Sequence, residues 1–347
     1  MERMLVLKGD NYEVGVKAGT ALAKLIKKAV VYYRGLIKKL SANKPAQTRD
    51  RISRYKKFLM KEGEAYYKEL VGTAKGSGIA LDDIILLNFR TDLLNREAKQ
   101  NEKPHECTSI GLVANKTKDG KIIVSQSWDF LCAPDKFILM IDYRINKKPR
   151  FITMAEAGML GKIGINETGL AVNTNLLACG YSSIGMSTAL LLRKSLEQES
   201  VQGVIAAVTN QQRAGTSYIL CGDKDLLLGI EYTPDDYAVI MPEDGILLHT
   251  NHFLAPKFEH FDYNRKGVES TFTRIASARQ MLDSIEGGID VEDIKRILAD
   301  KHVTVKGTGA DKYTDWATHR RLISVPVEKK LLIANMFGDG KYVTYTM

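Results

Sequence analysis

The sequence predicts an α+β fold in which two largely antiparallel β-sheets are covered by helices. Up to about residue 106, apolar residues recur every three or four positions, which is the period of an amphipathic helix. From Thr108 onward the pattern changes to that of β-strands. Strands and helices then arrive in blocks rather than in strict alternation. This order suits antiparallel sheets better than a doubly wound parallel sheet.

Three helices are predicted before residue 106. The first covers residues 22–40 and places its lysines on a solvated face. The second covers residues 49–75 and is expected to stop at a run of glycines, namely Gly72, Gly76 and Gly78. The third begins at residue 81, where Asp82 and Asp83 suit the unpaired N–H groups of a first turn, and runs to residue 94.

Beyond residue 106 the chain is predicted to open with a hairpin that turns at Lys118-Asp119-Gly120. Further strands are expected at residues 137–145, 150–156, 162–165, 170–175, 218–222, 226–232, 237–241, 246–249, 322–327 and 330–336. Further helices are expected at residues 188–198, 201–212, 271–284 and 291–298. No internal repeat or low-complexity linker divides the chain.

The composition is that of an ordinary globular protein, with 44% hydrophobic and 26% charged residues among 347. The N-terminal sequence does not resemble a signal peptide, and no window approaches the roughly 18 apolar residues of a membrane span. We therefore expect a soluble, cytoplasmic protein without a membrane partner. The four cysteines form no Cys-x-x-Cys pair, so we expect free thiols, no metal and no cofactor.

The net charge of +9 is concentrated before residue 107, where 22 Lys and Arg face 13 Asp and Glu; the remainder holds 28 of each kind. A basic face can bind nucleic acid. Here the lysines alternate with the apolar stripe of the first predicted helix, which is typical of a solvated helix face. We expect no nucleic-acid partner.

Cys107 lies where helical sequence gives way to strands, so cutting the 106–107 bond would make it a new N-terminus. An N-terminal cysteine carries its own base, because an α-amine has a pKa near 8 and a thiol one of roughly 8.5. The alternative interpretation is a small buried residue at the start of a strand.

Six ordered stretches carry a resemblance to a known family. They are ELVGTAKGSGIALDDIILLNFRTDLL, ECTSIGL, SQSWDF, GMLGKIGINETGLAVNTNLL, HTNHFL and STFTRIASARQML. The chain resembles the acyl-coenzyme A:6-aminopenicillanate acyltransferase family of N-terminal-nucleophile hydrolases, related to choloylglycine hydrolases and penicillin V acylases. The resemblance implies a four-layer αββα fold and self-cleavage before Cys107. Residues 1–106 would form a helical α chain and 107–347 a β chain, together one domain. Glu106 stands where family members often carry glycine.

The resemblance also implies roles for individual side chains. Asp129 would hold the freed amine, Asn251 would donate an N–H to the oxyanion, and Arg274 would favour the thiolate. Asn175, or Asn173 if the alignment slips by two residues, is a second candidate for contacting the substrate carbonyl. Trp128 and Phe130 are expected to line the core or an acyl pocket.

The function that the resemblance implies is a self-processing amidohydrolase or acyltransferase acting on a small-molecule N-acyl amide through a thioester. The sequence leaves open an acyl-CoA donor and a homo-oligomer. One alternative is a Cys–His hydrolase in an uncut chain, with His249 or His252 acting on Cys107. Another is a catalytically silent binding protein of the same fold.

Overall fold

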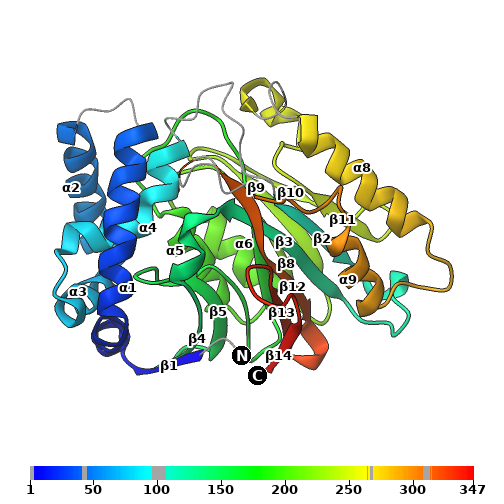
Figure 1. Ribbon diagram of the computed structural model, residues 1–347, viewed down its shortest axis with the longest axis horizontal. Helices are drawn as coiled ribbons and strands as arrows, with labels where there is room; N and C mark the ends of the chain where they lie inside the picture. Colours follow the sequence, from blue (N-terminus) through cyan, green and yellow to red (C-terminus); the bar gives the residue numbers. More distant parts are fainter. Residues whose placement is uncertain are drawn as a thin grey trace.

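The computed structural model describes residues 4–40, 45–95, 107–263, 265, 269–307, 313 and 315–347. Figure 1 shows four layers, in which helices cover the outer face of each of two sheets and the sheets pack against each other. The structure confirms the predicted α+β class and its αββα layering.

The larger sheet has eight strands in the order β1-β4-β5-β6-β7-β8-β9-β10. Neighbouring strands are antiparallel except for β1, which is parallel to β4. The bounds are β1 Met4–Gly9, β4 Ile138–Ile145, β5 Phe151–Glu156, β6 Ile163–Asn166, β7 Ala171–Leu176, β8 Ser217–Gly222, β9 Leu227–Tyr232 and β10 Tyr237–Ile240.

The smaller sheet has six antiparallel strands in the order β11-β2-β3-β12-β13-β14. The bounds are β2 Thr108–Leu112, β3 Ile123–Leu131, β11 Ile246–His249, β12 Trp316–Val325, β13 Lys330–Asn335 and β14 Tyr342–Thr346. The predicted hairpin is confirmed, since β2 pairs with β3 and Gly120 takes a positive φ of 65° in the turn.

One helical layer covers the larger sheet and the other covers the smaller sheet (Figure 1). The first comprises α1 Asn11–Leu40, α2 Pro45–Glu62, α3 Glu64–Ser77, α4 Leu81–Asn95, α5 Thr188–Leu196 and α6 Val201–Thr209. The second comprises α8 Glu269–Asp283 and α9 Val291–Ala299. Among the described residues, no helix is long and apolar enough to cross a membrane.

The prediction of one helix over residues 49–75 was wrong, because the chain breaks at Gly63 into α2 and α3. Gly72 and Gly76 do not end α3. They let α1 approach, since a Cβ at Gly72 would lie 2.3 Å from the Tyr12 carbonyl oxygen and one at Gly76 would lie 2.2 Å from that of Val16. The helix ends at Gly78, whose φ of 68° is the left-handed conformation that glycine favours.

Two edge strands, β1 and β14, were not predicted. Both are partly exposed, and burial alternates only over the last four residues of each. β1 lies within the part that was predicted to be entirely helical, and α1 already begins at Asn11. Short edge strands carry a weak sequence signal because only one side of their backbone pairs with a neighbour.

Alternation along β2 and β3 decides which side chains face the space between the sheets. Ile110 and Ile123 pack with α8 and α9, whereas Cys107, Val124 and Trp128 belong to the apolar cluster between the two sheets. Cys107 directly precedes β2, and because it belongs to the cluster between the sheets it lies at the inner face of the smaller sheet.

Candidate active site

Cys107 is buried, with 3% of its surface exposed, and its Sγ lies 3.6 Å from the backbone carbonyl oxygen of Asp129 on β3. Burial, followed by the charge of Asp129, raises the pKa of the Cys107 thiol to about 12. In the uncut chain the thiol is therefore held in its protonated form near neutral pH.

The backbone of Cys107 is held by two of the predicted site residues. Arg274 Nη1 donates to the Cys107 carbonyl oxygen at 2.6 Å and to Thr108 Oγ1 at 3.1 Å. Asn175 Nδ2 donates to the same carbonyl at 3.2 Å. Arg274 Nη2 also donates to Asn251 Oδ1 at 3.1 Å. The fold thus brings Cys107, Asn175, Asn251 and Arg274 together although they are far apart in the sequence.

Asn251 follows β11 and lies beside the pocket that contains Cys107. Its backbone N–H donates to Thr271 Oγ1 at 2.9 Å, which ties the loop to α8. Its Nδ2 donates to the carbonyl oxygen of Leu176 at 2.9 Å, and Leu176 lines the pocket. Because Arg274 also donates to Oδ1, both the nitrogen and the oxygen of the Asn251 amide are held by hydrogen bonds.

Asn175 is not among the described residues that line the pocket, and its amide bonds to two backbone carbonyls and one hydroxyl group. Its Nδ2 donates to the carbonyl oxygens of Cys107 and His249, both at 3.2 Å, and its Oδ1 accepts from Ser109. Asn173, the alternative in the alignment, is buried, and neither atom of its amide has a hydrogen-bond partner in the described part of the chain.

Asp129 lies on β3, where alternation puts its side chain on the face opposite to Trp128 and Phe130. Its Oδ1 accepts a hydrogen bond from Ser127 Oγ at 3.0 Å. Its charge contributes to the raised pKa of the Cys107 thiol, so the carboxylate is close enough to act on the nucleophile electrostatically.

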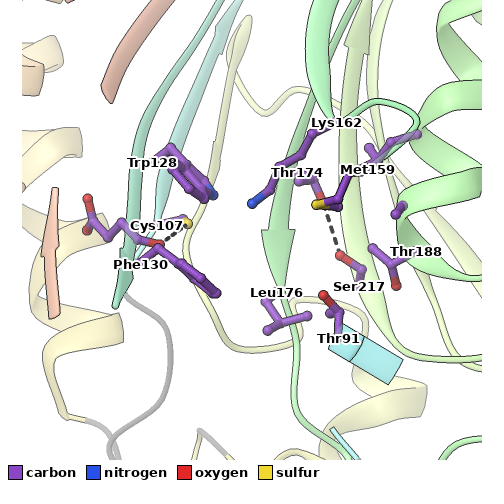
Figure 2. A pocket seen from close by; sticks show the side chains of 13 residues that line it. Thr91, Cys107, Trp128, Phe130, Met159, Lys162, Thr174, Leu176, Thr188 and Ser217 are labelled. Carbon is purple, nitrogen blue, oxygen red and sulfur yellow. Dashed lines mark hydrogen bonds between the residues drawn. The ribbon is translucent and has the colours of Figure 1, made fainter. Parts of the chain in front are cut away.

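Cys107 opens into a pocket of about 50 Å³ between the sheets (Figure 2). Trp128 and Phe130 stack on one side with their ring centroids 5.6 Å apart, as expected for residues of a core or acyl pocket. The other lining residues are Thr91, Asp129, Met159, Lys162, Thr174, Leu176, Thr188, Ala189, Leu192 and Ser217. The pocket is thus mainly apolar, with hydroxyl groups, one lysine and one aspartate among the described residues that line it.

Lys162 in this lining was missed by the sequence analysis. Its Nζ lies 3.8 Å from the centroid of the Trp128 ring and 3.5 Å from Glu156 Oε1. Burial lowers its pKa to about 8, despite the opposing effect of Glu156. A lysine directly before the fully buried strand β6 was the available signal, because a charged residue in such a position is unusual.

The two histidines of the Cys–His alternative have other partners. His249 Nδ1 lies 2.7 Å from the Thr250 carbonyl oxygen, and its Nε2 lies 2.9 Å from Glu231 Oε1. Burial lowers the pKa of His252 to about 3, and its Nδ1 lies 3.0 Å from Thr271 Oγ1. Among the described residues that line the pocket there is no histidine.

The predicted cleavage site is only half described, because Glu106 lies outside the described residues. Within the described ranges, no group of three or more His, Cys, Asp or Glu side chains is placed to hold a metal ion. The four cysteines are free thiols.

Comparison with known proteins identifies related chains. A profile of the acyl-coenzyme A:6-aminopenicillanic acid acyl-transferase family matches residues 115–319. The acyl-coenzyme A:6-aminopenicillanic-acid-acyltransferase 40 kDa form of Emericella nidulans is 28% identical over 71% of this chain and 68% of its own length. Two variants of conjugated bile acid hydrolase from Clostridium perfringens superpose with TM-scores of 0.53 and 0.51, at 14% identity, over 70% of this chain and 92% of theirs.

The αββα layering is that of the N-terminal-nucleophile hydrolase fold, which the structural neighbours share. The family match covers more than half of the chain. The chain therefore belongs to the acyl-coenzyme A:6-aminopenicillanic acid acyl-transferase family, and it is an enzyme of the acyltransferase and amide-hydrolase class, as the resemblance predicted.

Proposed function

We propose that this protein is a self-processing cysteine amidohydrolase or acyltransferase that forms a thioester acyl-enzyme on Cys107. The observation that carries the proposal is the position of Cys107. Its thiol lines a pocket between the sheets, while Arg274 and Asn175 hold its backbone carbonyl. A nucleophile fixed in this way can be presented to a bound amide without reorganisation.

In maturation, the Cys107 thiol adds to the carbonyl carbon of Glu106 and the C–N bond to Cys107 breaks. The acyl group moves to sulfur, and the α-amine of Cys107 takes up the proton. Water then hydrolyses the thioester and leaves a carboxylate on Glu106 and a free thiol. Residues 1–106 and 107–347 are proposed to remain one domain after the cut, because α1 to α4 share an apolar core with the larger sheet.

In turnover, the α-amine of Cys107 takes the thiol proton as the sulfur attacks the substrate carbonyl. It then returns that proton to the leaving amine. Asp129 is proposed to hold the resulting ammonium, because a carboxylate beside a cation favours its charged form. Release of the amine leaves a thioester, which water or a second amine resolves. The name of the fungal relative makes an acyl-coenzyme A thioester a second acyl donor to test.

Asn251 is proposed to donate through Nδ2 to the oxyanion that forms on the substrate carbonyl, in addition to the bond that Nδ2 makes to the Leu176 carbonyl oxygen. Arg274 would fix the amide orientation by donating to Oδ1, so that the nitrogen is directed away from the arginine. Loss of one such donor lowers turnover by about 100- to 1000-fold. We expect this loss in kcat for Asn251→Ala after confirmed processing; an unchanged kcat would leave Asn251 with a structural role only.

The direct test of the proposal is the mass of the purified protein under denaturing conditions. Wild type is expected to separate into residues 1–106 and 107–347, whereas Cys107→Ala is expected to stay as one inactive chain. Cys132→Ala is the matched control, since this thiol lines a different pocket, and it should be cut like wild type. An uncut wild-type chain with full amidase activity, or an N-terminus other than Cys107, would refute self-processing at this bond.

A further inference from the structure

Lys162 presents a positive charge to the same pocket as the nucleophile. Only 12% of its side chain is exposed. Its ammonium lies against the face of Trp128 at 3.8 Å and near Phe130 at 5.1 Å from the ring centroids. In Figure 2 the nitrogen of Lys162 points into the space between Trp128 and Thr174. The aromatic faces hold the cation at the pocket wall.

The carboxylate nearest to Lys162 is already matched by another cation. Glu156 Oε1, 3.5 Å from Lys162 Nζ, also accepts a hydrogen bond from Arg90 Nη2, and Glu156 Oε2 accepts one from the Tyr33 hydroxyl. Arg90 and Lys162 thus share one carboxylate. Lys162 is the member of this group that lines the pocket.

Asp129, the acidic residue among the described residues that line the pocket, has a separate role. The side chain of Asp129 is on the opposite face of β3 from Trp128, bonds to Ser127, and is the proposed partner of the freed amine of Cys107. The lowered pKa of Lys162, about 8, agrees with an ammonium that burial destabilises more than Glu156 stabilises it. A bound anion would relieve this imbalance.

We propose that Lys162 is a specificity residue that binds a carboxylate of the substrate, so that the enzyme prefers acyl compounds carrying a negative charge within reach of the scissile bond. This inference rests on the proposed function, because it specifies the substrate class of the same pocket. An ion pair at a lysine of which only 12% of the side chain is exposed is stronger than one at the surface. A hydrogen bond to a charged group is also stronger than one between neutral groups.

The test measures protection of Cys107 from iodoacetamide, followed by mass spectrometry of the peptide that contains it. The probes are a series of straight-chain carboxylates from butyrate to decanoate and the primary alcohols of the same lengths, which are neutral and cannot acylate the thiol. In wild type, at least one carboxylate should protect at a roughly 10-fold lower concentration than its alcohol. In Lys162→Met this preference should disappear, and in Lys162→Arg it should remain.

Lys301→Met is the control for net charge, because Lys301 is exposed and lies after α9; its preference should match wild type. Equal protection by acids and alcohols in wild type, or an unchanged preference in Lys162→Met, would overturn the inference. A loss of alkylation reactivity without loss of the preference would assign Lys162 to the thiolate instead. The readout needs no turnover, so it separates this inference from the proposed function: an amidase without the preference refutes only the role of Lys162.

Discussion

Two buried ionic clusters lie in the first helical layer and the larger sheet, and they are built in opposite ways. In the Arg193 cluster one buried cation lies between two carboxylates: Arg193 Nη1 and Nη2 pair with Glu69 at 3.1 and 2.9 Å, and Nε pairs with Glu197 at 2.9 Å. In the Glu156 cluster one carboxylate lies between two cations, Arg90 and Lys162.

The difference concerns what each cluster can do for a ligand. In the Arg193 cluster, Asn11 donates a further hydrogen bond to Glu69 and the partly exposed Lys148 donates one to Glu197. None of the described residues that line the Cys107 pocket belongs to this cluster. In the Glu156 cluster a cation borders that pocket. Charge balance and location together indicate that the first is structural and the second is built to meet an anion.

The largest expected effect comes from opening the Arg193 cluster. Arg193→Met leaves Glu69 buried without its cation and Glu197 with Lys148 alone, which should lower the free energy of unfolding by about 3–5 kcal/mol. Urea denaturation in the uncut Cys107→Ala chain would measure it. Arg144→Met is the comparison, because Arg144 is half-exposed and its partner Asp142 also pairs with Arg150. It should lower the free energy of unfolding by less than about 1 kcal/mol. Equal losses in the two variants would contradict the comparison.

The next effect is a pH dependence of stability that originates in Lys162. Its pKa is about 8 in the folded chain, below the ordinary 10.5 of the unfolded chain. Between these pH values the unfolded chain binds more protons, so stability should rise with pH. The rise attributable to Lys162 is on the order of 2–3 kcal/mol. The measurement is the free energy of unfolding from pH 7 to 10.5, with and without Lys162→Met in the uncut Cys107→Ala chain. The rise due to Lys162 should be absent in Lys162→Met, and parallel curves of unfolding free energy against pH for the two proteins would disprove it.

Much of the site could be predicted from sequence because short motifs carry it. The motifs are ECTSIGL with Cys107, HTNHFL with Asn251 and STFTRIASAR with Arg274. Arg274 donates to the carbonyl oxygen of Cys107 and to the side chain of Asn251, so the three residues lie together. The layering could be predicted because strands and helices arrive in blocks. These features depend on local pattern and on the order of elements.

The remaining features depend on contacts between segments that the sequence does not connect. The close approach of α1 and α3 explains why Gly72 does not end a helix. Lys162 joins the site because β6 of one sheet lies across from Trp128 of the other. The Asn175 amide donates hydrogen bonds to the backbone carbonyl oxygens of Cys107 and His249, which are distant in the sequence. Periodicity and motif spacing do not specify such long-range pairings.

The smallest expected effect concerns His252, which separates the amine base from a histidine base. A general base works best with a pKa near the operating pH, and its loss typically costs about 100- to 10,000-fold in rate. Burial and the charges of His249, Arg265 and Arg274 hold the pKa of His252 at about 3, so it stays neutral across the working range and is a poor base there. Its ring nitrogen Nδ1 is within hydrogen-bond distance of Thr271 Oγ1, which makes it part of the support for the Asn251 loop.

Processed His252→Asn should therefore keep kcat within about tenfold of wild type, with the same pH–rate profile from pH 5 to 9. A loss of about 1000-fold together with a missing titration in that profile would transfer the role of base from the Cys107 amine to His252.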